Sequence, residues 1–213
     1  MFITLEGPEG SGKTTQAVLL AERLRRMGRA VVLTREPGGT PIGDQVRAVL
    51  HDPQNEEMDP WAEVLLYSAS RAQLVSQVVL PALAAGKIVV CDRYYDSTLA
   101  YQGYGRGLDL AALWAITRLA TRGLTPDLTL CLDIDPQRGL ERRLLGGGEW
   151  NRLDGEALAF HRRVRAGYLE LAGLEPERWV LVDAARSVDE VHQVLWAVVE
   201  RRLSQEGDAP PGL

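Results

Sequence analysis

Residues Gly7-Pro8-Glu9-Gly10-Ser11-Gly12-Lys13-Thr14 decide the fold class of this 213-residue chain. They match the pattern G-x-x-x-x-G-K-[ST], in which backbone N–H groups cradle phosphates and the lysine reaches the phosphate oxygens. An apolar strand is predicted before this stretch at Phe2–Glu6, and an amphipathic helix after it at Thr14–Met27. We therefore predict a phosphate-binding loop (P-loop) whose phosphates lie at a helix N-terminus.

Short apolar runs alternate with helical stretches along the rest of the chain. Such runs are typical of strands that helices cover on both faces. The alternation predicts an α/β fold with a doubly wound, five-stranded parallel sheet flanked by helices, the P-loop NTPase fold, with a short lid. The other strands are expected at Ala30–Arg35, Ile88–Asp92, Leu128–Asp133 and Val180–Asp183, and the other helices at Pro60–Leu83 (broken before Pro81), Leu108–Arg122 and Ser187–Leu203. One domain is expected over 1–206, with the lid at about 142–154 and a disordered tail at 207–213.

Composition restricts the class of protein. The formal net charge of −5 argues against a nucleic-acid partner, because such binding requires neutralisation of phosphates. No apolar run approaches the ~20 residues that span a bilayer, and no signal peptide is recognisable, so we expect no membrane partner and a cytoplasmic protein. Cys91 and Cys131 each lie in an apolar strand, which favours buried, reduced core residues over a disulfide or metal pair.

Charged groups at the predicted strand ends indicate the chemistry. The carboxyl ends of parallel strands meet at one edge of the sheet, where ligands bind. Asp92 and Arg93 end one strand, so the carboxylate can hold Mg²⁺ together with the Thr14 hydroxyl, and the guanidinium can contact an acceptor phosphate. The loop is expected to bind ATP through Gly7, Gly10, Ser11, Gly12, Lys13, Thr14 and Thr15. An N-K-x-D guanine motif does not occur, which disfavours a GTPase.

Several further stretches carry family-level information. The most specific are Arg35-Glu36-Pro37-Gly38-Gly39-Thr40 and Asp92-Arg93-Tyr94, together with the P-loop. Others are Tyr67-Ser68-Ala69-Ser70-Arg71, Ala100-Tyr101-Gln102-Gly103, Pro126-Asp127-Leu128-Thr129-Leu130 and Tyr168-Leu169-Glu170-Leu171. In this order and at this spacing, they give the chain a resemblance to the bacterial thymidylate kinases, a family of P-loop nucleoside monophosphate kinases. The resemblance implies direct in-line transfer of a phosphoryl group from Mg·ATP to dTMP, which gives dTDP and ADP.

The resemblance also implies a set of residues that bind dTMP. Glu9 would accept from the 3′-hydroxyl, Tyr67 would stack on thymine, and Arg71 would donate to a thymine carbonyl. Arg93 would clamp the phosphate, and Tyr101 would exclude a 2′-hydroxyl. Arg35 and Pro37 would shape the phosphate loop, and Thr98 and Gln102 would line the base pocket.

The lid is where the chain departs from the family pattern. Its P-loop has no basic residue at positions 9–11, so the resemblance implies that a lid arginine stabilises the moving phosphoryl group. Arg152 matches that role best, and Arg142 is assigned to stacking on adenine, with Arg143 nearly as good. Gly146-Gly147-Gly148 stands where the family often has a more basic stretch. Outside the lid, the loop around Asp183-Ala184-Ala185-Arg186 is expected to contact adenine through its backbone.

The expected catalytic residues are thus Lys13, Asp92, Arg93 and Arg152. The expected metal ligands are Thr14 and Asp92. Two alternatives remain: a kinase for another nucleoside or nucleoside monophosphate, or an ATP-dependent switch protein. The resemblance further implies a homodimer. The apolar residues that could form either the core or a dimer face are Leu65, Leu66, Val75, Leu110, Leu113 and Trp114.

Overall fold

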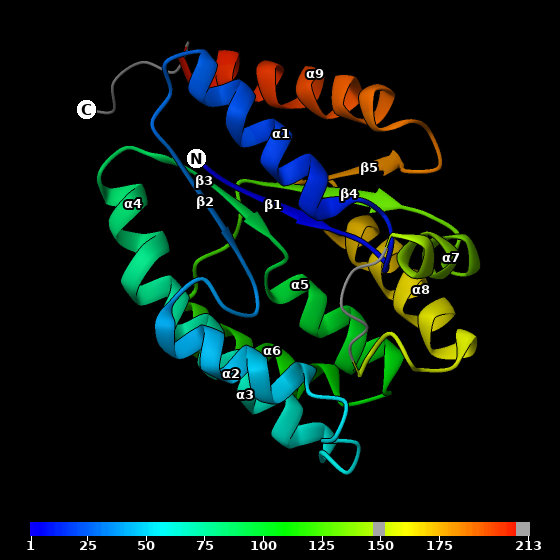
Figure 1. Cartoon of the computed structure of the whole chain (residues 1–213). Coiled ribbons are helices and arrows are strands. Elements are labelled where there is room, and N and C mark those ends of the chain that lie inside the picture. The colour runs from blue at the N-terminus through cyan, green and yellow to red at the C-terminus, as the bar shows by residue number, and fades with distance from the viewer. Residues whose placement is uncertain (147–151, 208–213) are drawn as a thin grey trace.

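The computed structural model of the chain describes residues 1–146 and 152–207. Within these residues, five parallel strands form a single sheet in the order β2–β3–β1–β4–β5 (Figure 1). The expected doubly wound parallel sheet is therefore confirmed. The strands are β1 (Phe2–Glu6), β2 (Val31–Arg35), β3 (Ile88–Asp92), β4 (Leu128–Asp133) and β5 (Trp179–Asp183).

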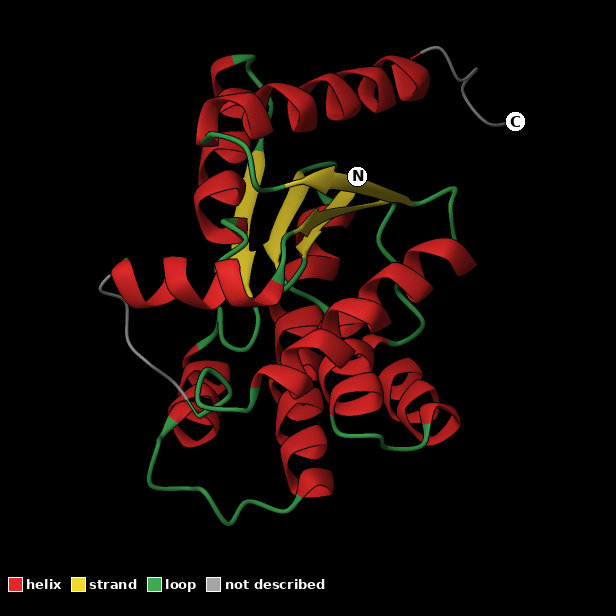
Figure 2. Cartoon of the chain, turned by 90° about the vertical axis from the view of Figure 1, so that its right-hand side faces the viewer, coloured by secondary structure: helices red, strands yellow, loops and turns green. Residues whose placement is uncertain are grey.

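Helices cover both faces of this sheet. Figure 2 shows the strands between two helical layers. On one face, α1 (Lys13–Arg26) packs beside α9 (Val188–Gly207). The remaining elements lie on the other face or at the carboxyl edge of the sheet: α2 (Pro41–His51), α3 (Pro60–Leu74), a π-helical segment (Val75–Val79), α4 (Leu80–Ala84), α5 (Tyr95–Thr98), a second π-helical segment (Leu99–Gly105), α6 (Leu110–Thr121), α7 (Pro136–Leu145) and α8 (Leu158–Leu174).

Two apolar clusters, one on each face of the sheet, form the core. The α1 and α9 face is filled by residues such as Leu20, Leu24 and Leu195, and the opposite face by Val64, Leu99 and others. Cys91 and Cys131 are both buried and free, as expected. None of the helices in the described ranges combines the length and apolar character needed to cross a membrane.

The predicted strand boundaries agree with the observed ones to within one residue. The helix expected at Pro60–Leu83 is interrupted, but by a π-helical turn rather than by a break at Pro81. Pro81 lies in the first turn of α4, where its missing N–H removes no bond that a helix requires. Of the expected lid, 147–151 lies outside the described residues, as does nearly all of the expected tail, 208–213.

Candidate active site

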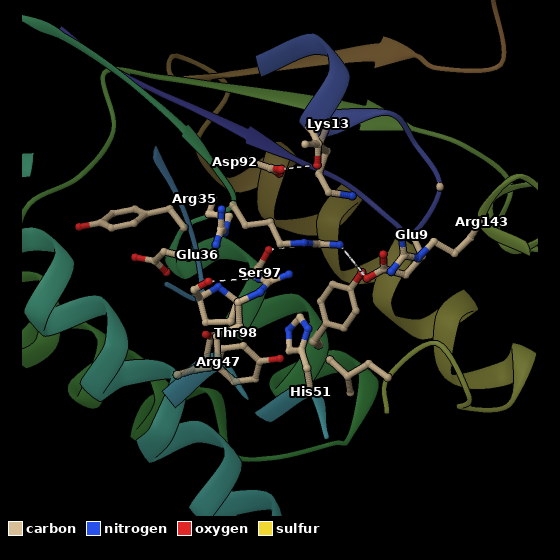
Figure 3. Close-up of a pocket in the computed structure, with 18 of the residues that line it drawn as sticks. Glu9, Lys13, Arg35, Glu36, Arg47, His51, Asp92, Ser97, Thr98 and Arg143 are labelled. Atoms are coloured by element: carbon tan, nitrogen blue, oxygen red, sulfur yellow. Dashed lines mark hydrogen bonds and ion pairs between the residues drawn. The ribbon is translucent and has the colours of Figure 1, made fainter. Parts of the chain in front are cut away.

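A cavity of about 660 Å³ opens at the carboxyl edge of the sheet. The P-loop and Asp92 form one end of it, and α2, α3 and the Tyr95–Gly105 segment form the other (Figure 3). Its lining comprises Glu9, Gly10, Gly12, Lys13, Thr14, Thr15, Arg35, Glu36, Pro37, Arg47, His51, Tyr67, Arg71, Asp92, Arg93, Tyr94, Ser97, Thr98, Tyr101, Gln102, Arg142, Arg143, Gly146 and Leu153. Residues from distant parts of the chain therefore meet there.

Lys13, Thr14 and Asp92 form the phosphate end. The Lys13 ammonium is buried and donates to the Pro8 carbonyl at 2.7 Å and to Ser11 Oγ at 3.2 Å. Burial and the nearby Arg93 lower the pKa of Lys13 to about 8, so the ammonium is mostly charged at neutral pH. Thr14 Oγ1 donates to Asp92 Oδ2 at 2.5 Å, while Asp92 Oδ1 is buried without a partner among the described residues.

Arg93 lines the cavity and links the P-loop to the Tyr95–Gly105 segment. Its Nη2 donates to Glu9 Oε1 at 2.7 Å and to Tyr101 Oη at 3.2 Å, and Tyr101 Oη also donates to that Glu9 oxygen at 2.8 Å. Burial would raise the pKa of Glu9, but Arg93 and Lys13 outweigh it and lower the value to about 2. Arg93 adopts φ 71°, a left-handed conformation that costs energy for any residue with a Cβ. Such strain is typical of functional positions.

A buried carboxylate, Glu6, is linked to Arg93 through two hydroxyl groups. Glu6 is inaccessible to solvent and accepts from Tyr94 N at 2.7 Å, Ser97 Oγ at 2.6 Å and Tyr168 Oη at 3.0 Å. Arg93 Nη1 donates in turn to Ser97 Oγ and Tyr168 Oη, both at 3.2 Å. Glu6 therefore orders the two hydroxyls that hold the guanidinium of Arg93.

Arg71 lies at the far end of the cavity and is held by three neighbouring residues. Its Nε donates to Glu36 Oε2 at 2.7 Å, and its Nη2 donates to Thr98 Oγ1 at 3.1 Å and to the Tyr94 carbonyl at 3.4 Å. The Arg71 side chain is 1% exposed, and its Nη1 has no partner in the part of the chain that the structure describes. Because Arg71 lines the cavity, a ligand carbonyl that reached this nitrogen would supply the missing partner.

Gln102 is fixed in the same manner on an adjacent wall. Its Nε2 donates to Glu63 Oε1 at 2.7 Å, and both residues are buried. Glu63 also accepts hydrogen bonds from Arg106 Nε at 2.8 Å and from the guanidinium of Arg152. Burial would raise the pKa of Glu63, but hydrogen bonds from Arg106 and Arg152 keep it below its ordinary value. Glu63 is therefore an ionised carboxylate that can only accept.

The three arginines expected around the lid occupy different places. Arg142 Nη1 donates to the Ala184 carbonyl at 2.7 Å and Nη2 to the Ala185 carbonyl at 3.2 Å, which places it at the loop after β5. Arg143 lines the cavity near Glu9 (Figure 3). It also pairs with Asp154 at 3.3 Å. Arg152 binds Glu63 and does not line the cavity, so its role in transfer stays a prediction.

Two glycines bring the P-loop against α7. Gly10 has φ 67°, and a Cβ there would lie 1.9 Å from the Gly139 carbonyl oxygen. A Cβ on Gly139 would lie 2.2 Å from the Glu9 carbonyl oxygen. Real Cβ atoms do not approach backbone this closely, so any larger residue at either position would separate the loop from the helix.

The cavity brings together all nine residues that the sequence suggested for dTMP. It also contains Gly10, Gly12, Lys13, Thr14, Thr15, Asp92 and Arg142. Ser11 lines a neighbouring hollow of about 340 Å³ that Arg142, Ala184 and Arg186 border, on the side where adenine contacts were expected. Gly7 lines neither space, but its carbonyl accepts from Arg93 Nη1 at 3.2 Å.

Sequence reasoning missed two cavity residues on α2, Arg47 and His51. Arg47 Nη1 donates to the Pro37 carbonyl at 3.1 Å. Burial and Arg47 lower the pKa of His51 to about 4, so this imidazole is neutral at physiological pH. Both residues lie on α2, one helical turn apart. Thr40 followed by Pro41 is typical of a helix N-terminus, so this pair could have predicted α2 from the sequence.

The chain is similar to known thymidylate kinases over nearly its full length. The family model described as thymidylate kinase matches residues 5–195. Thymidylate kinase of Deinococcus radiodurans is 56% identical over 95% of this chain and 97% of its own, and that of a Roseiflexus species 53% identical over 96% and 95%. The crystal structure of thymidylate kinase from Ehrlichia chaffeensis is 35% identical, with a TM-score of 0.77 over 94% of this chain and 98% of that one.

Proposed function

The chain belongs to the thymidylate kinase family, which phosphorylates dTMP on the route to dTTP, and we propose that the described cavity is where it does so. The observation that carries this assignment is the two-ended cavity. A P-loop forms one end, a pocket of Tyr67, Arg71 and Gln102 forms the other, and Arg93 lies between them. A nucleotide acceptor in this cavity would place its phosphate at Arg93 and its base beside Arg71.

The proposed reaction is direct in-line transfer of the γ-phosphoryl group of ATP to a phosphate oxygen of dTMP. The acceptor phosphate is already ionised near neutral pH, so no strong general base is needed. Lys13 and Arg93 would supply positive charge to the moving phosphoryl group, and their fixed positions would contribute most of the catalysis. Arg93 would exchange its contact with Glu9 for the acceptor phosphate, which frees Glu9 for the 3′-hydroxyl.

The residues at the phosphate end fit Mg²⁺. Mg²⁺ prefers oxygen ligands and is usually held by one or two carboxylates together with substrate phosphates. Thr14 Oγ1 and Asp92 Oδ2 are 2.5 Å apart, and the buried Asp92 Oδ1 lacks a partner among the described residues. When bound with ATP, the ion would neutralise charge on the β- and γ-phosphates.

The role proposed for Arg142 is supported by its observed contacts, whereas the role proposed for Arg152 requires a movement of the lid. The position of Arg142 beside the Ala184 and Ala185 carbonyls supports a place at the adenine. For Arg152 we propose that closure of a lid at about 142–154 would transfer its guanidinium from Glu63 to the phosphoryl group. Arg143 lines the cavity already and is the alternative donor of charge.

We also propose that the chain works as a homodimer through the outer face of α3. The structure divides the apolar candidates, because Val75 and Leu113 are buried, Leu66, Leu110 and Trp114 are partly buried, and Leu65 is 56% exposed. The exposed positions on α3 follow one stripe of the helix: Trp61, Ala62, Leu65, Ala69 and Ala72. Sedimentation should give a dimer for the native chain and a monomer for Leu65→Asp.

A cytoplasmic location is proposed for the same enzyme. Both cysteines are unpaired in the core, which suits a reducing compartment.

An ADP-release assay across several acceptors tests the proposed function. dTMP should give the highest kcat/KM, dUMP a lower value because one methyl contact is worth only ~1–3 kcal/mol, and UMP, CMP and thymidine the least. Preference for another acceptor would favour the alternative kinase. ADP release that no acceptor stimulates would favour a switch ATPase.

A further inference from the structure

The wall that faces the base of the proposed acceptor offers a particular pair of polar atoms. Arg71 Nη1 is a buried donor with no partner in the described ranges, whereas Nε is bonded to Glu36 and Nη2 to Thr98. The Gln102 amide has one donor end and one acceptor end, and both residues line the cavity. Which end of that amide faces the cavity therefore decides which bases can bind.

Glu63 settles the orientation of the Gln102 amide. An ionised carboxylate has no proton to donate, so the Gln102 atom that lies 2.7 Å from Glu63 Oε1 must be the NH₂ nitrogen. Arg106 and Arg152 keep Glu63 ionised through ion pairs, and the Glu63 side chain has no solvent exposure. The amide oxygen is left as the acceptor. Rotating the amide would place two acceptors against each other in a buried site, which is costly.

The resulting pair of one donor and one acceptor matches a single edge of one kind of pyrimidine. Thymine and uracil present a carbonyl oxygen at C4, which can accept from Arg71, beside an N3–H, which can donate to Gln102. Cytosine presents an amino group at C4 and an unprotonated N3, so donor would face donor and acceptor would face acceptor. Both mismatches would occur in a desolvated pocket, where unpaired polar groups are most costly.

We propose that Glu63 is a positioning residue that sets base specificity, by holding the Gln102 amide so that only a 4-oxo pyrimidine is accepted. The inference rests on the proposed function of the cavity and extends it to a residue that need not touch the substrate. Glu63 acts through Gln102 as Glu36 acts through Arg71, so a buried carboxylate fixes each residue proposed to read the base.

Kinetics of Glu63→Gln with three acceptors test this inference. A glutamine at position 63 can donate or accept, so Gln102 becomes free to rotate and present its NH₂ group to N3 of cytosine. The ratio of kcat/KM for dTMP to that for dCMP should fall by about 10-fold or more. The ratio for dTMP to dUMP should not change, because these two bases share the same edge.

Arg106→Gln is the matched control. It removes one ion pair of Glu63 but leaves Arg152 to keep the carboxylate ionised, so the Glu63–Gln102 hydrogen bond is kept; stability should fall while both ratios stay at the native values. If Glu63→Gln does not fold, the charge-balanced Glu63→Gln/Arg106→Gln variant should show the same loss of discrimination.

An unchanged dTMP-to-dCMP ratio in the folded variant would overturn the proposal. An equal fall in the dUMP ratio would overturn it too, since that result reports general damage to the pocket. Failure of the proposed function itself would appear separately, as a native enzyme that does not use dTMP.

Discussion

The two ends of the cavity solve the same electrostatic problem in opposite ways. At the phosphate end the groups that would bind ligands are bonded to neighbouring protein groups instead: Arg93 binds Glu9, Lys13 binds the Pro8 carbonyl, and Thr14 binds Asp92. At the base end buried carboxylates fix the polar groups in place: Glu36, which itself lines the cavity, holds Arg71, and Glu63 holds Gln102. The phosphate end must therefore rearrange on binding, whereas the base end is already in its binding geometry.

This difference fits the two tasks. Phosphates carry enough charge to displace internal partners, and contacts that form only during transfer are those that accelerate it. A neutral base offers weak, directional hydrogen bonds, so its recognition requires donors and acceptors whose positions are fixed beforehand. Substitutions at the phosphate end should therefore affect turnover, and those at the base end should affect affinity and specificity.

The largest effect is expected for Arg93→Ala. Loss of this guanidinium removes positive charge at the acceptor phosphate and leaves Glu9 without its cation, so kcat/KM for dTMP should fall about 1,000-fold. Steady-state kinetics would measure the loss. Arg165→Ala is the control, because Arg165 pairs with Asp133 outside the cavity lining and its removal should leave kcat/KM near the native value. A loss confined to KM would contradict the assignment of Arg93 to transfer.

The free energy of unfolding should depend on pH through Glu6, the buried carboxyl group that is linked to Arg93 by Ser97 and Tyr168. Burial and the nearby Asp96 raise its pKa from 4.5 to about 7 in the folded chain. A raised carboxyl pKa stabilises the fold fully below about pH 4.5, and this contribution is lost as pH rises through about 7. The loss would be at most about 3 kcal/mol.

Urea unfolding at several pH values would test the Glu6 prediction. Glu6→Gln cannot ionise and should show a smaller decline in the free energy of unfolding between pH 5 and pH 8. The same decline in both proteins would assign the titration to another group.

Arg71→Lys should reduce kcat/KM for dTMP by about 100-fold, mainly through KM, and leave KM for ATP unchanged. A lysine is a point charge that cannot contact Glu36, Thr98 and a base from three nitrogens at once. Arg178→Lys disturbs another buried arginine, paired with Asp96, and should lower stability without changing KM. Full activity in Arg71→Lys would show that the base end is less fixed than its contacts indicate.

The smallest of the four effects is expected for Arg152→Ala. Because Arg152 starts on Glu63, only a lid movement would bring it to the reaction, and we expect kcat to fall about tenfold with little change in KM for dTMP. Arg143→Ala, assayed in parallel, distinguishes the two arginines. Unchanged turnover in Arg152→Ala would remove this residue from the catalytic set and leave Arg143 as the candidate.

The fold and the phosphate end were predictable because their signals are local. The P-loop pattern occupies eight adjacent residues, and the five strands are short apolar runs that a sequence displays directly. The sequence also suggested which residues gather at the cavity, through strand ends that meet at one edge and through the family resemblance.

The contacts at the base end were not predictable from the sequence. Glu36 is 35 positions from Arg71, and Glu63 is 39 positions from Gln102, so no spacing rule links them. Gln102 also lies in a π-helical segment, where the side-chain direction differs from that of an α-helix. Arg152 shows the reverse, because a sequence match suggested its role but could not show that Glu63 holds it here.

The close approach of Gly10 and Gly139 has a mechanical consequence. With no side chain between them, the tip of the P-loop and the first turn of α7 touch backbone to backbone, and they would move as one rigid piece. Any bending toward the nucleotide would then be confined to the part of α7 after Gly139, which carries Arg142 and Arg143 and is tied by them to the Ala184 and Ala185 carbonyls and to Asp154. The length of this part, less than two helical turns, would limit how far these arginines can travel.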